Sequence, residues 1–167
     1  MSPLRGGRRP GVPVAAGEKV LASAGATDGR VAAGTRDAFY VHSDAGTVRV
    51  PWEQVEAADW DADTSVLRVS EVGSWGEARP EHVLTLDDPG RLLELVRERV
   101  TATVVLQRHI PVYGRRGLRV IARRAPGGDR RVTWIYEYDA GVDPDDPEVR
   151  ETARAALAQA REEVGLA

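Results

Sequence analysis

The first half of the chain alternates short apolar runs with turn residues, which is typical of short β-strands. Within residues 17–87 these runs recur at regular intervals, and in the run ending at Val50 the valines fall on one face. Such spacing predicts a small antiparallel barrel or sandwich. The expected strands are residues 20–22, 29–33, 38–41, 47–50, 55–60, 66–69 and 83–86.

A helix is predicted to follow the seventh strand. Asp88 is a suitable N-cap residue, and Pro89 suits the first helical position. Leu92, Leu93, Val96 and Val100 then fall on one face at helical spacing. We expect this apolar stripe to cover one open end of the barrel.

Residues 103–167 are predicted to form a β-β-β-α unit. Three alternating runs are separated by turn signals, one of them at the glycines around Arg115 and Arg116. A final helix should take its N-cap from Asp145-Asp146, begin at Pro147 and end at Gly165. Its alanine-rich stripe permits close packing on a sheet. The expected strands are residues 104–110, 118–123 and 132–138.

One short segment carries a resemblance to a known fold family. The run Val50-Pro51-Trp52-Glu53-Gln54-Val55 looks like the x-P-W-x-x-(I/V) step between middle strands of bacterial pleckstrin-homology-like (PH-like) domains. The order of strands and helix in residues 17–102 also resembles that fold, and the whole chain resembles an actinobacterial group with an appended C-terminal part. The resemblance implies an α+β, mostly β fold: a PH-like antiparallel barrel capped by a helix, followed by the β-β-β-α unit. It also implies a scaffold for protein, peptide or lipid binding.

Lipid headgroups are the least suitable of these ligands. Phosphoinositide-binding members of the family carry basic residues around the loop joining the first two strands, whereas here residues 24–29 include Asp28 and no basic residue. Residues 17–102 hold nine basic and sixteen acidic side chains, a net charge of −7. An anionic membrane surface would repel such a domain.

The N-terminal residues 1–16 are rich in Gly, Pro and Arg and show no apolar period. Such a stretch buries too little surface to offset its ordering entropy, so we expect a flexible, dispensable tail. A nucleic-acid or anion-binding arm is the alternative. The tail gives no apolar signal-peptide core, and no later run is long enough to span a bilayer, which favours a cytoplasmic protein.

The sharpest charge anomaly lies in the second half. Residues 108–131 hold eight arginines against one aspartate, a net charge of +7, and residues 132–167 have a net charge of −6. The arginines either pair internally with the acidic final helix or barrel, or form a partner surface for protein or nucleic acid. Arg119, Ile121 and Arg123 share one strand face. The candidate partner-binding residues are Arg115, Arg116, Arg119, Arg123, Trp134 and Tyr136.

Catalytic and metal-binding patterns are weak, and we expect no cofactor, metal or catalytic residue. The chain has no cysteine, and His42, His82 and His109 are far apart in sequence. Asp59, Asp61 and Asp63 match the first spacings of a calcium loop, but the later glycine and glutamate positions do not match. The acidic run from Asp143 to Glu148 is better explained by helix capping.

The sequence therefore predicts a non-catalytic interaction or scaffolding module that binds a protein partner, through a sheet edge or through the face carrying Trp134–Tyr138. The alternative is nucleic-acid binding through the Arg108–Arg131 stripe, which the net charge of −3 disfavours. An enzyme using His82 or His109 is the least favoured class. The sequence leaves the oligomeric state open.

Overall fold

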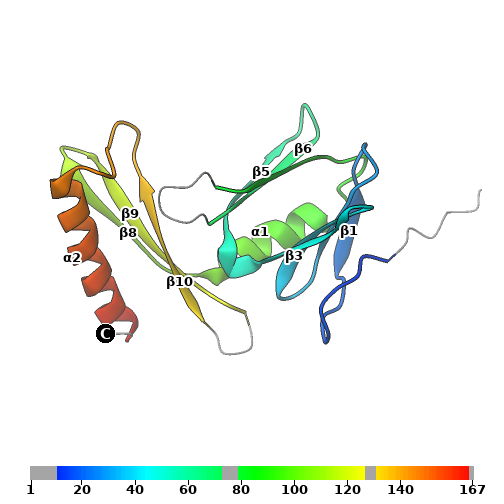
Figure 1. The fold of residues 1–167 in the computed structure, drawn as a ribbon, viewed down its shortest axis with the longest axis horizontal. Helices are drawn as coiled ribbons and strands as arrows, with labels where there is room; N and C mark the ends of the chain where they lie inside the picture. The colour runs from blue at the N-terminus through cyan, green and yellow to red at the C-terminus, as the bar shows by residue number, and fades with distance from the viewer. Residues whose placement is uncertain (1–10, 73–78, 127–130, 166–167) are drawn as a thin grey trace, which may run out of the picture.

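The computed structural model describes residues 11–72, 79–126 and 131–165. It confirms an α+β fold made mostly of strands, with three antiparallel sheets and two long helices (Figure 1). The predicted turn at residues 126–129 lies largely outside the described residues. None of the described helices is long and apolar enough to cross a lipid bilayer.

The first seven strands form two separate sheets. The four-stranded sheet has the order β1-β2-β3-β4, and the three-stranded sheet has the order β5-β6-β7. Among the described residues, one isolated bridge between Ala26 and Leu86 joins them, and neither sheet closes into a barrel. The strands are β1 (Ala22–Gly25), β2 (Val31–Gly34), β3 (Ala38–Ser43), β4 (Gly46–Pro51), β5 (Val55–Asp61), β6 (Val66–Glu71) and β7 (Glu81–Thr85).

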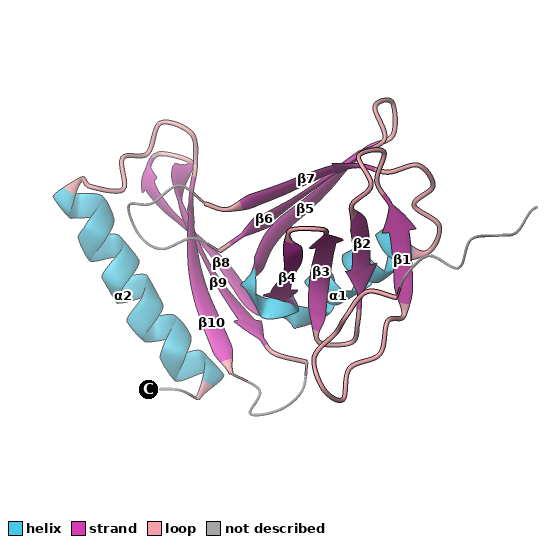
Figure 2. Cartoon of the chain, turned by 45° about the vertical axis from the view of Figure 1, so that its right-hand side comes forward, coloured by secondary structure: helices cyan, strands magenta, loops and turns pink. Residues whose placement is uncertain are grey.

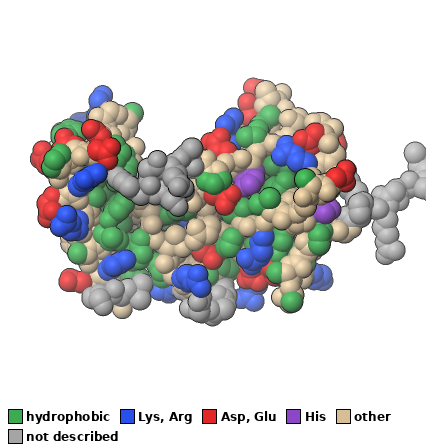
Figure 3. Space-filling view, viewed as in Figure 1, with side chains coloured by type: hydrophobic (Ala, Val, Ile, Leu, Met, Phe, Trp, Pro, Cys, Tyr) green, Lys and Arg blue, Asp and Glu red, His purple; other side chains and the backbone are tan. Residues whose placement is uncertain are grey.

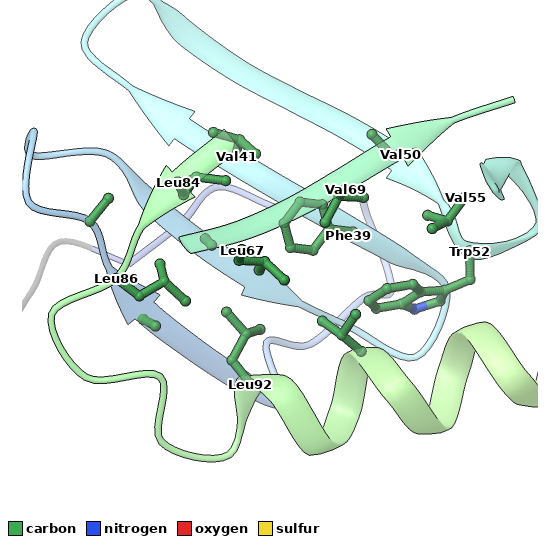
Figure 4. Packing of buried hydrophobic residues seen from close by; sticks show 14 residues of the cluster. Phe39, Val41, Val50, Trp52, Val55, Leu67, Val69, Leu84, Leu86 and Leu92 are labelled. Carbon is green, nitrogen blue, oxygen red and sulfur yellow. The ribbon is translucent and has the colours of Figure 1, made fainter. Parts of the chain in front are cut away.

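The two sheets and helix α1 (Leu92–Thr103) enclose the larger core. Figure 4 shows side chains from both sheets and the helix pointing toward one another. Trp52, in the short 3-10 helix η1 (Trp52–Gln54), is fully buried there, and its indole N–H donates to the Thr35 carbonyl at 2.9 Å. The tryptophan of the x-P-W-x-x-V segment is therefore an anchor of the core.

Helix α1 begins later than predicted. Asp88 accepts a hydrogen bond from the Gly90 amide, and the Leu92 amide donates to the Pro89 carbonyl. These bonds close a turn instead of a first helical turn, so the regular helix starts at Leu92. The predicted apolar face is nevertheless the one that packs on the sheets.

The C-terminal unit has the predicted β-β-β-α order. Strands β8 (Val104–Tyr113), β9 (Arg116–Arg124) and β10 (Val132–Tyr138) form a sheet of order β10-β9-β8, and helix α2 (Pro147–Val164) packs on one face (Figure 2). The Asp146 side chain caps α2 by accepting from the Glu148 amide, and Gly165 ends the helix in a left-handed conformation. Both ends of α2 confirm the start and the end predicted from the sequence.

The predicted flexible segment, residues 1–16, has a packed end. Val12 is buried against the outer face of the first sheet with Ala33 and Tyr40, and the Ala15 amide donates to the Tyr40 hydroxyl at 3.0 Å. Residues 11–16 thus include a packed stretch, because valines separated by Gly and Pro still reach an apolar patch. Residues 1–10 lie outside the described residues.

Glu18 anchors this segment to the first sheet. Its nearly buried carboxylate accepts from the Thr35 and Tyr40 hydroxyls, each at 2.6 Å, and from Arg49 Nε at 3.1 Å. Burial alone would raise the pKa of Glu18, but the hydrogen bonds from Thr35, Tyr40 and Arg49 outweigh it and lower the pKa.

We expect Glu18→Gln to lower the free energy of unfolding by about 1–2 kcal/mol at pH 7, because the amide replaces one of two accepting oxygens. Since the folded-state pKa is lowered, the carboxylate contributes its stability above the ordinary glutamate value of 4.5 and loses it as the pH falls further. Urea unfolding between pH 7 and 3 measures both effects. A difference between the two proteins that stays constant below pH 4.5 would contradict this role.

Candidate functional site

The predicted arginine stripe is divided between the interior and the surface. Arg123 is only 5% exposed and donates to the Val100 carbonyl at 2.7 Å, the Thr103 hydroxyl at 2.9 Å and the Glu56 carbonyl at 3.1 Å. Burial lowers the pKa of Arg123. These contacts join β9 to both α1 and β5, so Arg123 is an internal group at the junction of the two units.

The remaining candidate arginines are more exposed and do not form one surface with Arg123. Arg119 lies 3.6 Å from Glu137 on β10. Arg108 pairs with Glu163 on α2, as expected if the arginines pair internally with the acidic final helix. Arg115 and Arg116 are exposed at the β8–β9 hairpin. On the face shown in Figure 3, basic and acidic side chains are interspersed.

Trp134 and Tyr136 belong to the core of the C-terminal unit. Both are partly buried against the cluster beneath α2, and the Tyr136 hydroxyl donates to the Ala153 carbonyl at 3.2 Å. Burial raises the pKa of Tyr136. Helix α2 thus packs over the face of the sheet that carries Trp134 and Tyr136.

Two of the three histidines have carboxylate partners. His109 Nε2 lies 2.8 Å from Asp139 Oδ2, and His82 Nε2 lies 2.6 Å from Glu71 Oε2. Asp139 also accepts from the Gly117 amide at 2.8 Å, so the His109 pair ties the β8–β9 hairpin to the chain after β10.

His109 also lines a hollow of about 170 Å³ between β8 and α2. Its neighbour Ile110 packs toward α2. Strand alternation places the His109 side chain, which contacts Asp139, on the face of the sheet opposite α2.

The aspartates at the β5–β6 turn have a structural explanation. Asp61 Oδ1 accepts from the amides of Asp63 and Thr64, at 2.9 and 3.3 Å, which lowers the pKa of Asp61. This carboxylate stabilises the turn. Within the described ranges, no three His, Asp or Glu side chains gather in a way that could hold a metal ion.

A hollow of about 280 Å³ lies between β5 and α1. Its walls are largely apolar and only partly covered, and Asp59 and Arg97 lie at its rim. In strand alternation Ala58 and Trp60 face the helix, whereas Ala57 and Asp59 face away. The lining residues are Ala58, Asp59, Trp60, Leu67, Leu93, Val96, Arg97, Val100 and Thr101.

This hollow lies beside an edge of the sheet with which none of the described strands pairs. β5 is the outermost strand of the β5-β6-β7 sheet, and its register with β6 shifts between Val55 and Ala57. From Ala57 to Asp61 the pairing is regular and contains no proline. The outer side of this stretch thus offers backbone groups in an extended row.

Edge strand β8, which contacts α2, is less suited to strand addition than β5. β8 carries Pro111, which lacks an N–H, and its register with β9 shifts at Val104/Leu106 and again at Pro111/Tyr113. Proline and bulges are devices that protect sheet edges from pairing. Of these two edge strands, β5 is therefore better able to accept another strand.

Comparisons with family models, with curated proteins and with solved structures found no match. The groove residues were not among the candidates from sequence, because Leu93, Val96 and Val100 have the spacing of ordinary core positions. The sequence does not show that β5 is an edge strand, and only the structure shows that Trp60 is partly buried there.

Proposed function

We propose that the chain is a non-catalytic interaction module that binds an extended segment of a partner protein along the outer edge of β5. The hollow between β5 and α1 carries this proposal, because it lies directly beside a regular, proline-free edge strand. In strand addition the peptide backbone pairs with the edge, and pockets for alternate side chains give specificity.

The surroundings of the groove define the chemistry of the partner. Trp60, Leu93 and Val100 provide apolar walls, so every second side chain of the bound segment would be apolar and directed inward. Asp59 and Arg97 give the rim both signs of charge, which suits polar side chains at the intervening positions. The partner is therefore an extended segment with alternating apolar and polar residues.

A PH-like arrangement of residues 17–102 is part of the same proposal. Two antiparallel sheets closed by a C-terminal helix, with Trp52 and Val55 of the x-P-W-x-x-V segment in their shared core, support it. Nucleic-acid binding is the weaker candidate, because Arg123 is internal and Arg108 and Arg119 face carboxylates.

Ala58→Leu tests the groove directly, because a larger apolar side chain at this position fills the hollow without adding charge. Segments that bind the wild-type chain would first be selected from a random displayed-peptide library. We expect their affinity, measured by fluorescence anisotropy, to fall at least about tenfold in Ala58→Leu.

Ala57→Leu is the matched control, since the same change one residue earlier faces away from the groove. It should bind the selected segments with the affinity of the wild type. The melting temperatures of both variants show whether each remains folded. Equal affinity of the selected segments for all three proteins, or a library that yields no binder, would overturn the proposal.

A further inference from the structure

A residue of the C-terminal unit contacts both elements that form the groove between β5 and α1. Arg123 on β9 reaches across and binds both walls: Nη1 donates to the Val100 carbonyl of α1, and Nη2 donates to the Glu56 carbonyl of β5. Val100 is itself a lining residue of the hollow, and Glu56 precedes the paired stretch of β5. The guanidinium group therefore lies where the groove walls meet the second unit.

The Glu56 carbonyl is available for this contact because of the bulge in β5. Pairing with β6 passes from Val55 to Ala57, so Glu56 has no cross-strand partner in the ladder. Arg123 donates to the carbonyl of this unpaired residue, so the guanidinium binds β5 directly before its regularly paired stretch begins at Ala57.

The chemistry of the side chain suits this bridging role. Arg123 is almost completely buried, and none of the described carboxylates lies within salt-bridge distance of it. Its partners are two backbone carbonyls and the Thr103 hydroxyl, which in turn donates to the Val100 carbonyl at 2.8 Å. A planar guanidinium can donate to acceptors on two elements at once, whereas an ammonium group is a point charge on a flexible stem.

We propose that Arg123 is a positioning residue that fixes the separation of β5 and α1 and sets one end of the groove. This inference rests on the proposed function of the groove. A bound segment can then pair with β5 only from Ala57 to Asp61, which fixes its register. The C-terminal unit contributes to recognition without contacting the partner through a surface of its own.

Hydrogen–deuterium exchange tests the positioning role without any partner. In Arg123→Met, amide exchange in Ala57–Asp61 and Arg97–Thr103 should rise by about tenfold or more, as expected when charge-assisted hydrogen bonds are lost. Exchange in β3 and α2 should stay unchanged. Arg119→Gln is the control, because Arg119 lies on the same strand face but pairs with Glu137 at the surface.

Arg123→Lys keeps the positive charge but cannot donate to both carbonyls. It replaces Arg123→Met in this experiment if Arg123→Met does not fold. It should show the same local increase, together with an at least about tenfold weaker affinity for segments selected on the wild type. Unchanged exchange in the groove walls, or an equal increase throughout the chain, would overturn the positioning role. If no segment binds the wild type, the proposed function fails, while the exchange pattern still decides the role of Arg123.

Discussion

Replacing Gly117 with alanine should lower the free energy of unfolding by about 3 kcal/mol, the largest effect expected of a methyl group added at any of the described glycines. A Cβ atom at this position would overlap the Ile110 carbonyl oxygen and lie 2.7 Å from Pro111 Cα. Both atoms are backbone atoms of β8, so no side-chain rotation relieves the clash. The close approach occurs beside the register shift between Pro111 and Tyr113.

Urea unfolding followed by circular dichroism measures this effect, with Gly114→Ala as the control. Gly114 has a φ of 62° in the same hairpin but an open surrounding, so alanine there should cost only about 1–2 kcal/mol of backbone strain. A Gly117→Ala variant no less stable than Gly114→Ala would show that β8 and β9 do not approach each other as described.

Trp52→Ala should destabilise the first unit by about 3–5 kcal/mol, because it empties the centre of the larger core. Trp52 is fully buried, with its ring centroid 6.0 Å from that of Phe39. Trp52→Phe separates the hydrogen bond from the packing: it retains an aromatic ring but leaves the Thr35 carbonyl without the indole donor, at a cost of about 1–3 kcal/mol.

Trp60→Ala is the comparison for Trp52→Ala, because Trp60 is only partly buried at the wall of the groove. Chemical denaturation should show a clearly smaller loss of stability for Trp60→Ala. If both alanine variants lose the same stability, Trp60 is a core residue and the groove is not open in solution.

The elements that follow local chemical rules could be predicted from sequence. Asp146 and Pro147 start α2, Gly165 ends it, and Gly114 turns the β8–β9 hairpin, because each signal acts within a few residues. The late start of α1 shows the limit of such signals. Asp88 and Pro89 satisfy the rules for a helix start, but they close a turn before Leu92.

Features that depend on long-range packing could not be predicted from sequence. Alternation places Arg119 and Arg123 on one face of β9, but it does not show that β5 and α1 cover Arg123 and leave Arg119 partly exposed. Likewise, the two sheets formed by the first seven strands are joined by a bridge between residues far apart in sequence, Ala26 and Leu86. The groove residues have the sequence pattern of core positions.

The position of a bound segment tests the central claim most directly. Isotope-filtered NMR of the labelled chain with a library-selected segment should show contacts between the segment backbone and Ala57–Asp61. Side-chain contacts should reach Trp60 and Val100, and the amides on the outer side of β5 should become protected from exchange. Contacts confined to β8 and α2, with the β5 amides unchanged, would contradict the account.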